Sequence, residues 1–410
     1  MRGTAEIRAL GSGTSMARAF CALAAAAAMP FAAAALEKIA CIDTFDFAKV
    51  YDIERRSGCE KMLEHIARTG ADAMAWRNQT GGMPRYRSAE ERLPLSDMPF
   101  SKLRVPESRE GYAWLKLDRG EVDLLAYPCE ITAASGRTPA VHLTVEENHY
   151  FSFTFSTWVL EHPEFWCVMS NGTPWPGHGS FSYHEEIDHR IRLLDEILDR
   201  GVKLVFLGTG RQGGYGPRFE YTPVNVARWR SKYNCNPPKD WHDPKWIRHC
   251  GELYERFILS MARRCRQRGV RMIMGLRIFT LDSDEMKDVY GVDWRRLCAA
   301  GEIDGICFPY VDFRAPSAKG LDPWTATDRT YALAASLKGK ADVYFAVNAY
   351  PGQSKNSFSD YAEATGLSKA ECATRLLELA KKHGARGVVL QIVDYGNYPE
   401  DVCKAIRDFK

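Results

Sequence analysis

Several features that would assign a function at once are missing from this 410-residue sequence. The formal net charge is only +3, so the chain lacks the basic excess of a nucleic-acid-binding protein. Its histidines form no H-E-x-x-H pair and its cysteines no C-x-x-C pair, so we expect neither a metal centre nor a bound cofactor. Beyond the N-terminus, no apolar run approaches the roughly 20 residues that a membrane span needs.

The N-terminus carries the clearest targeting signal. Three arginines precede the apolar, alanine-rich run "AFCALAAAAAMPFAAAA", which ends in an A-x-A pattern. This pattern predicts a secretory signal peptide over residues 1–35 that is cleaved after Ala35, and a secreted or periplasmic mature chain of residues 36–410. The alternative, a membrane anchor, is disfavoured because the run is short and ends in small residues.

The cysteines are scattered along the chain. In an exported protein a disulfide is plausible, and Cys235 and Cys250 flank a loop that a bridge would stabilise. Cys41, Cys265 and Cys307 lie in apolar strand or helix patterns, which predicts buried thiols.

Eight short apolar segments with strand character recur along the mature chain. They are residues 38–45, 72–78, 140–146, 203–208, 271–278, 305–309, 343–348 and 387–393. Helical patterns lie between most of them, for example over 183–200 (with Ser182 as N-cap), 246–268 and 369–383.

Strands that alternate with helices indicate a parallel sheet, and continuously apolar strands indicate a sheet that is covered on both faces. Eight of them predict a single-domain α/β protein, a (β/α)8 TIM barrel with long βα loops. A doubly wound open sheet is the alternative. No internal repeat or low-complexity linker divides the chain.

The segment Gly208–Gly213 reads G-x-G-x-x-G after an apolar strand, as in dinucleotide-binding proteins. In that motif the glycines open a helix, whereas here the next helical pattern starts only near Thr222. We therefore interpret the segment as the loop after barrel strand four, which argues against a dehydrogenase.

Four phrases come in a recognisable order: "EHPEFW", "DRGVKLVFLGTGR", "YTPVNVARWRSKYNCNPP" and "YGVDWRRLCAAGEIDGICFPY". Together they resemble the bacterial family-10-like glycosyl hydrolases, from about residue 38 to the C-terminus. The resemblance implies an exported (β/α)8 protein that acts on carbohydrate.

The chain departs from this family on strand four, where relatives read approximately D-G-I-E-L-D-F-x-R. Lys203, Phe206 and Gly208 replace the three acidic residues, and Arg211 alone fits the pattern. The acid that relatives place at the end of this strand is therefore absent.

Active sites of such barrels lie at the carboxyl ends of the strands, and glycosidic cleavage usually needs two carboxyl groups. In "AVHLTVE" the residues Val141, Leu143 and Val145 alternate with more polar ones, so Glu146 is predicted to point into the barrel mouth. A structural carboxylate is its alternative role. Asp312 and Asp394, which follow strands six and eight, are candidate partners, and Glu220 is a candidate substitute for the missing acid.

Other polar and aromatic side chains are expected at the same mouth. The predicted substrate-binding residues are Trp76, Arg77, His149, Arg211, Arg277, Tyr310, Asn348 and Tyr350. Arginines suit a carboxylate or sulfate group, so an acidic sugar is one hypothesis. The alternative is that Arg77, Arg211 and Arg277 neutralise Glu146 and its neighbours.

Two functions remain open on the sequence. One is an exported glycoside hydrolase that acts on a poly- or oligosaccharide. The other is a catalytically inactive barrel that binds glycans, which the missing strand-four acid favours. Barrels host many chemistries, so the fold alone does not decide between them.

Overall fold

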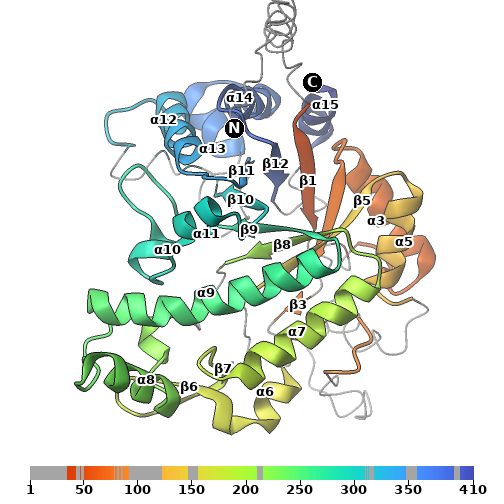
Figure 1. Cartoon of the computed structure of the whole chain (residues 1–410). Helices are drawn as coiled ribbons and strands as arrows, with labels where there is room; N and C mark the ends of the chain where they lie inside the picture. The colour runs from red at the N-terminus through yellow and green to blue at the C-terminus, as the bar shows by residue number, and fades with distance from the viewer. Residues whose placement is uncertain are drawn as a thin grey trace, which may run out of the picture. The chain divides into compact units, whose positions relative to one another are not determined.

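The computed structural model describes residues 35–42, 47, 50–77, 79–80, 83–84, 86–91, 122–145, 156–209, 216–309, 311, 313, 318–347, 358–391 and 398–410. Leu36–Lys410 form one compact unit, in which eight parallel strands close into a barrel (Figure 1). The strands are β1 (Glu37–Ile42), β2 (Ala73–Arg77), β5 (Thr138–Thr144), β8 (Leu204–Gly208), β9 (Arg271–Gly275), β10 (Gly305–Phe308), β11 (Asp342–Ala346) and β12 (Gly387–Leu390). Each strand lies where the sequence predicts one, so the (β/α)8 barrel is confirmed and the open sheet is excluded.

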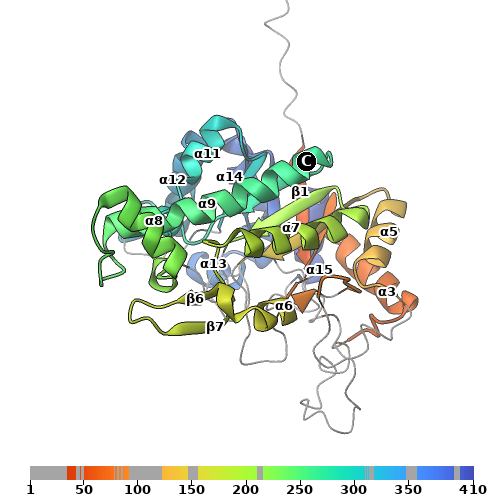
Figure 2. The same cartoon turned by 60° about the horizontal axis from the view of Figure 1, so that its bottom comes forward.

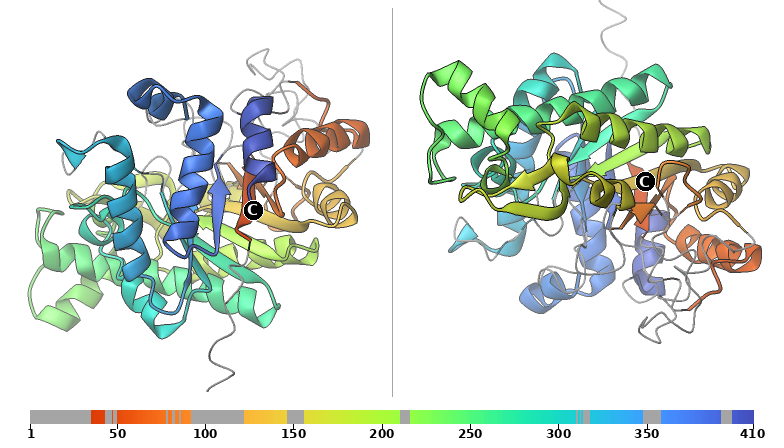
Figure 3. Two further views of the ribbon diagram at one scale, coloured as in Figure 1. Left: turned by 90° about the horizontal axis from the view of Figure 1, so that it is seen from above. Right: turned by 90° about the horizontal axis from the view of Figure 1, so that it is seen from below.

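One helix of an outer ring follows each barrel strand. These helices are α3 (Arg56–Ala67), α5 (Ala126–Ala134), α7 (His184–Asp199), α9 (Pro244–Gln267), α11 (Trp294–Ala300), α12 (Pro323–Ser336), α14 (Lys369–Lys382) and α15 (Glu400–Asp408). Figure 3 shows the helices around the strands from two opposite sides. None of the described helices is long and apolar enough to cross a membrane.

Local sequence explains where several of these helices begin. The Asp243 carboxylate accepts hydrogen bonds from the first backbone N–H groups of α9, and Ser368 forms a capping box with Glu371 at the start of α14. The predicted cap of α7 by Ser182 is wrong, because the helix begins one residue later with Tyr183 at its N-cap. The Ser182 hydroxyl instead hydrogen-bonds Thr222, 2.8 Å away.

The side chains of each strand alternate between the barrel interior and the layer under the helices. The interior cluster contains Ile39, Cys41, Ala73, Ala75, Ala140, Leu204, Phe206, Ile273, Cys307, Tyr344, Ala346 and Val389. Val141 and Leu143 belong to the outer cluster, which the helices cover. The alternation predicted for strand β5 is therefore confirmed over its described residues.

Three polar side chains that contact one another lie at the amino-terminal end of the barrel. Arg271 pairs with Glu37 (Nη2–Oε1 2.6 Å), and the Tyr344 hydroxyl donates to the other Glu37 oxygen at 2.9 Å. Burial acts to raise the pKa of Glu37, but Arg271 and Tyr344 outweigh it and hold this pKa below its ordinary value. Since β1, β9 and β11 all contribute, the group ties three strands together at this end.

Two long connections lie at the opposite end, toward which the strands run. Between β5 and α7 the chain forms α6 (Thr157–Glu161), a 3-10 turn (Pro163–Phe165) and the antiparallel pair β6 (Trp166–Val168) and β7 (Pro174–Gly179). Between β8 and α9 it forms a second 3-10 turn (Pro217–Phe219) and α8 (Pro223–Tyr233). Figure 2 shows β6, β7 and α6 on one side of the barrel below α7.

The shorter elements are β3 (Gln79–Thr80), β4 (Met83–Pro84), α10 (Glu285–Asp288) and α13 (Phe358–Thr365). After the glycine-containing segment, α8 is the first described α-helix, with Thr222 at its N-cap. The glycines therefore do not open a Rossmann helix within the described residues.

The described cysteines are free thiols. Cys41, Cys265 and Cys307 are buried as predicted. The predicted Cys235–Cys250 bridge is wrong: Cys235 is exposed, whereas Cys250 is buried in an aromatic cluster, where the Asn225 amide donates to its sulfur at 3.7 Å.

Candidate functional site

Most of the predicted site residues lie outside the residues that the structure describes. These are Glu146, His149, Arg211, Tyr310, Asp312, Asn348, Tyr350 and Asp394. The structure does describe Trp76, Arg77, Arg277 and Glu220. It also describes the strands that the other predicted site residues follow in the sequence.

Three polar side chains form the last described layer of the barrel interior on strands β2 and β5. Arg77 ends β2 and follows the interior residues Ala73 and Ala75, and it is only 2 % exposed. His142 pairs with Arg77 in the strand register, and Thr144 is two residues further along β5. The Thr144 hydroxyl is buried and has no hydrogen-bond partner among the described residues.

Trp76 does not belong to this layer, which corrects its assignment as a sugar-stacking residue. Its side chain is fully buried in the outer cluster, and its indole N–H donates to the Thr132 hydroxyl on α5 at 3.3 Å. Because neighbouring strand residues point to opposite faces, Arg77 and Trp76 cannot both point into the barrel.

Arg277 follows β9 and is engaged by other residues. Its guanidinium pairs with Glu285 on α10 (Nε–Oε1 3.0 Å) and lies 4.8 Å from the centre of the Tyr290 ring. Its described carboxylate partner is thus Glu285, which weakens the hypothesis that Arg277 binds an acidic sugar.

Glu220, the candidate substitute acid, is buried beneath β6. It accepts a hydrogen bond from the Ser180 hydroxyl at 2.6 Å and is only 3 % exposed. Burial raises the pKa of the Glu220 carboxyl to about 7, against the opposing effects of Ser180 and Arg256. A carboxyl group with this pKa could donate a proton, but its burial removes it from the surface that a polysaccharide would contact.

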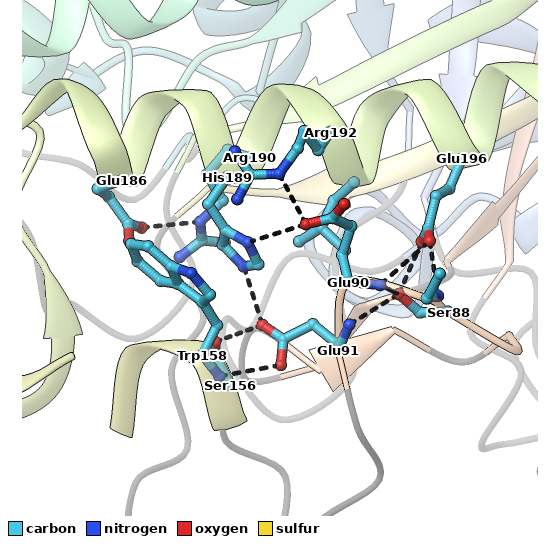
Figure 4. Close-up of polar contacts among 12 residues, drawn as sticks. Ser88, Glu90, Glu91, Ser156, Trp158, Glu186, His189, Arg190, Arg192 and Glu196 are labelled. Carbon is cyan, nitrogen blue, oxygen red and sulfur yellow. Dashed lines mark hydrogen bonds and ion pairs between the residues drawn. The ribbon is translucent and has the colours of Figure 1, made fainter. Parts of the chain in front are cut away.

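The structure also contains a buried ionic cluster between α7 and the connection that holds α6, which sequence reasoning missed (Figure 4). The Glu91 carboxylate accepts hydrogen bonds from the Ser156 hydroxyl, from the hydroxyl and N–H of Thr157 and from the Trp158 N–H. It also accepts one from His189 Nε2 at 3.0 Å, and the His189 ring stacks on Trp158 at 4.3 Å.

These contacts determine the charge of Glu91. Burial acts to raise its pKa, but the hydrogen bonds from His189, Ser156 and Thr157 outweigh burial and hold the pKa below its ordinary value. The carboxylate is therefore ionised at neutral pH. We call Glu91, Ser156, Thr157, Trp158 and His189 the Glu91 clamp.

The Glu91 clamp joins parts of the chain that are distant in sequence, since Glu91 and His189 are 98 residues apart. Further along α7, the Glu196 carboxylate accepts from the Ser88 hydroxyl at 2.7 Å, and Arg192 pairs with Glu90 at 2.7 Å. In the sequence, the contact between α7 and the Glu91 segment could have been recognised from the polar residues that α7 carries on a second buried face.

In the described ranges, no three His, Cys, Asp or Glu side chains come together as potential metal ligands. What the described layer offers instead is a fixed positive charge, an imidazole and a hydroxyl on two adjacent strands. Such groups bind and orient polar ligands.

No family model and no curated protein matches this sequence. Solved structures do match. The catalytic domain of β-amylase from Paenibacillus polymyxa superposes with a TM-score of 0.55 at 10 % identity, over 92 % of this chain and 98 % of that chain. The PgaB (BpsB) glycoside hydrolase domain from Bordetella bronchiseptica gives a TM-score of 0.52 at 13 % identity, over 91 % and 98 %.

The fold is a TIM barrel, which this chain shares with both of these structures. The resemblance found in the sequence is thus supported at the level of the barrel, whereas membership of the family-10-like group is not shown. At identities this low, the similarity establishes the fold and leaves the reaction to be argued from the residues.

Proposed function

We propose that this chain is an exported glycoside hydrolase that cleaves a poly- or oligosaccharide at the carboxyl-terminal mouth of its barrel. The observation that carries the proposal is the polar layer of Arg77, His142 and Thr144, which follows an apolar barrel interior. A sugar presents hydroxyl groups that need such hydrogen-bonding partners, and the fold is one that carbohydrate-cleaving proteins use.

Glu146 is the proposed catalytic carboxylate. It lies two residues beyond Thr144, so continued alternation along β5 would direct it to the side of the strand that carries His142 and Thr144. The charge of Arg77 on the adjacent strand favours an ionised carboxylate nearby, as a nucleophile or base requires.

The second carboxyl group is proposed to be Asp312, after β10, or Asp394, after β12. Either would have to lie about 5–9 Å from Glu146 for glycosidic cleavage. His149, Arg211, Tyr310, Asn348 and Tyr350 are the proposed sugar contacts from the neighbouring loops. An acidic sugar remains the proposed substrate class, with Arg211 as its proposed guanidinium partner.

Replacing Glu146 tests this assignment. Glu146→Gln keeps the size of the side chain but removes its charge, so we expect the rate of reducing-end release to fall at least about a hundredfold. Glu147→Gln is the matched control, since it changes the adjacent carboxylate, and we expect it to retain most of the activity. Equal rates for wild type and Glu146→Gln would remove Glu146 from the reaction.

The second candidate function is glycan binding without catalysis. It is favoured by the end of β8, where Gly208 stands in place of an acid. On this alternative the protein binds glycans but releases no reducing ends from any of them.

A further inference from the structure

Besides the carboxylates proposed above, the described barrel interior contains the imidazole of His142. His142 lies on β5 between Val141 and Leu143, both of which face the helices, so its own side chain points inward. Its ring meets the interior residue Phe206 edge-on, with ring centres 5.1 Å apart. Unlike its two neighbours, His142 is partly exposed rather than buried.

The Nε2 atom of His142 occupies the space beside Gly208 on the next strand. A Cβ atom built on Gly208 would lie only 2.8 Å from His142 Nε2, closer than real Cβ atoms approach a neighbour. Any side chain at position 208 would therefore displace the imidazole. The glycine that replaces the strand-four acid is also the residue that makes room for His142.

We propose that His142 is a catalytic residue that acts as the general acid, in place of the second carboxyl candidates Asp312 and Asp394. This inference rests on the proposed hydrolase function. An imidazole can donate and accept protons near neutral pH, which is the chemistry that general acid–base catalysis requires. The charged group that shares its layer is Arg77, its register partner on β2.

In the proposed step, an N–H of the protonated His142 donates its proton to the glycosidic oxygen as the bond between that oxygen and the anomeric carbon breaks. A water molecule supplies hydroxide to the anomeric carbon and gives its proton to the Glu146 carboxylate. The products are two sugars with free hydroxyl groups. Proton exchange with solvent then restores both side chains, so the reaction consumes one water.

The test compares kcat, KM and the pH profile of kcat for wild type and three variants. His142→Gln should lower kcat by about 10²- to 10⁴-fold with a much smaller change in KM, and should remove the limb of the pH profile that an imidazole produces. His184→Gln is the matched control, because this histidine is 79 % exposed at the start of α7 and should leave both readouts unchanged.

A double variant tests the spatial argument directly. His142→Ala combined with Gly208→Asp removes the imidazole and places a carboxyl group in the space it leaves. We expect it to recover part of the kcat lost in His142→Gln and to move the limb of the pH profile toward the acidic range of a carboxyl group.

The outcomes separate the two proposals. Unchanged kcat and pH profile in His142→Gln, with Glu146→Gln inactive, would overturn the role of His142 and leave the hydrolase intact. No hydrolysis by wild type of any glycan would overturn both. If His142→Gln does not fold, the wild-type profile decides, and the absence of any limb between about pH 5 and pH 8 would contradict the proposal.

Discussion

Glu220 shows how strongly the surroundings of a single residue set its chemistry. Its carboxyl group accepts a hydrogen bond from the Ser180 hydroxyl, which also contacts the Ser182 hydroxyl, and Ser182 in turn contacts the Thr222 hydroxyl. The burial that raises its pKa to about 7 also makes its ionised form costly to keep in the folded protein.

We predict that Glu220→Gln becomes increasingly stabilising, relative to wild type, as pH rises. The folded-state pKa of about 7 exceeds the ordinary value of 4.5, so the folded protein holds a proton that the unfolded chain releases between these pH values. The contribution of Glu220 to the free energy of unfolding therefore falls between about pH 4.5 and pH 7, by about 3 kcal/mol in total. Glutamine does not titrate, so it avoids this loss.

Urea unfolding of both proteins at pH 5 and pH 8 measures the effect. Burial lowers the pKa of His178 and His249 to about 4, so their contributions are lost as pH falls from about 6.5. They titrate in both proteins and cancel in the difference between variant and wild type. A difference that is the same at pH 5 and pH 8 would show that Glu220 is not protonated in the fold.

The alternation of strand residues predicts which single side chains face the barrel interior. In "AVHLTVE" it predicts the helix-facing positions of Val141 and Leu143 and the opposite face for His142, as the structure shows. On β2 the prediction that Trp76 and Arg77 share one mouth is wrong, because consecutive strand residues point to opposite faces.

At the scale of elements, the Glu91 clamp holds two connections against one helix. Glu91 ends one described segment and Ser156 begins another, and His189 on α7 fixes both through the shared carboxylate. Ser156 is the first described residue after Glu146 in the sequence, so the clamp fixes the chain at this position.

We predict that Glu91→Gln destabilises the protein by about 3 kcal/mol, because it removes the charge of a buried carboxylate that accepts several hydrogen bonds and leaves some of their donors unsatisfied. Glu90→Gln is the matched control: Glu90 lies on the same segment but is partly exposed, and it pairs with Arg192 at 2.7 Å and with His189 only at 4.0 Å, so its loss should cost at most about 1 kcal/mol. Thermal and urea unfolding measure both, and equal effects would contradict a buried clamp.

The elements of the barrel could be predicted because strands buried on both faces form continuous apolar runs. The connection between β5 and α7 could not, since the two strands β6 and β7 and the single turn of α6 are too short for a periodic pattern to be recognised. Tertiary contacts stabilise these elements, notably the Glu91 carboxylate at the start of α6. Most of the candidate site lies outside the described residues.

At the scale of the whole molecule, the two ends of the barrel differ in chemistry. Glu37, Arg271 and Tyr344 satisfy one another at the amino-terminal end. At the other end the Thr144 hydroxyl lacks a partner among the described residues, and His142 is partly exposed. This asymmetry is why we place the proposed substrate at the carboxyl-terminal mouth, the position of active sites in TIM-barrel enzymes.

The most direct test of this account is reducing-end release by the wild-type protein on a panel of neutral, uronic and sulfated polysaccharides, with glycan binding measured in parallel. We predict release from at least one member of the panel, with a preference for an acidic one. Binding without release from any polysaccharide would contradict the proposed hydrolase and establish the barrel as a glycan-binding protein.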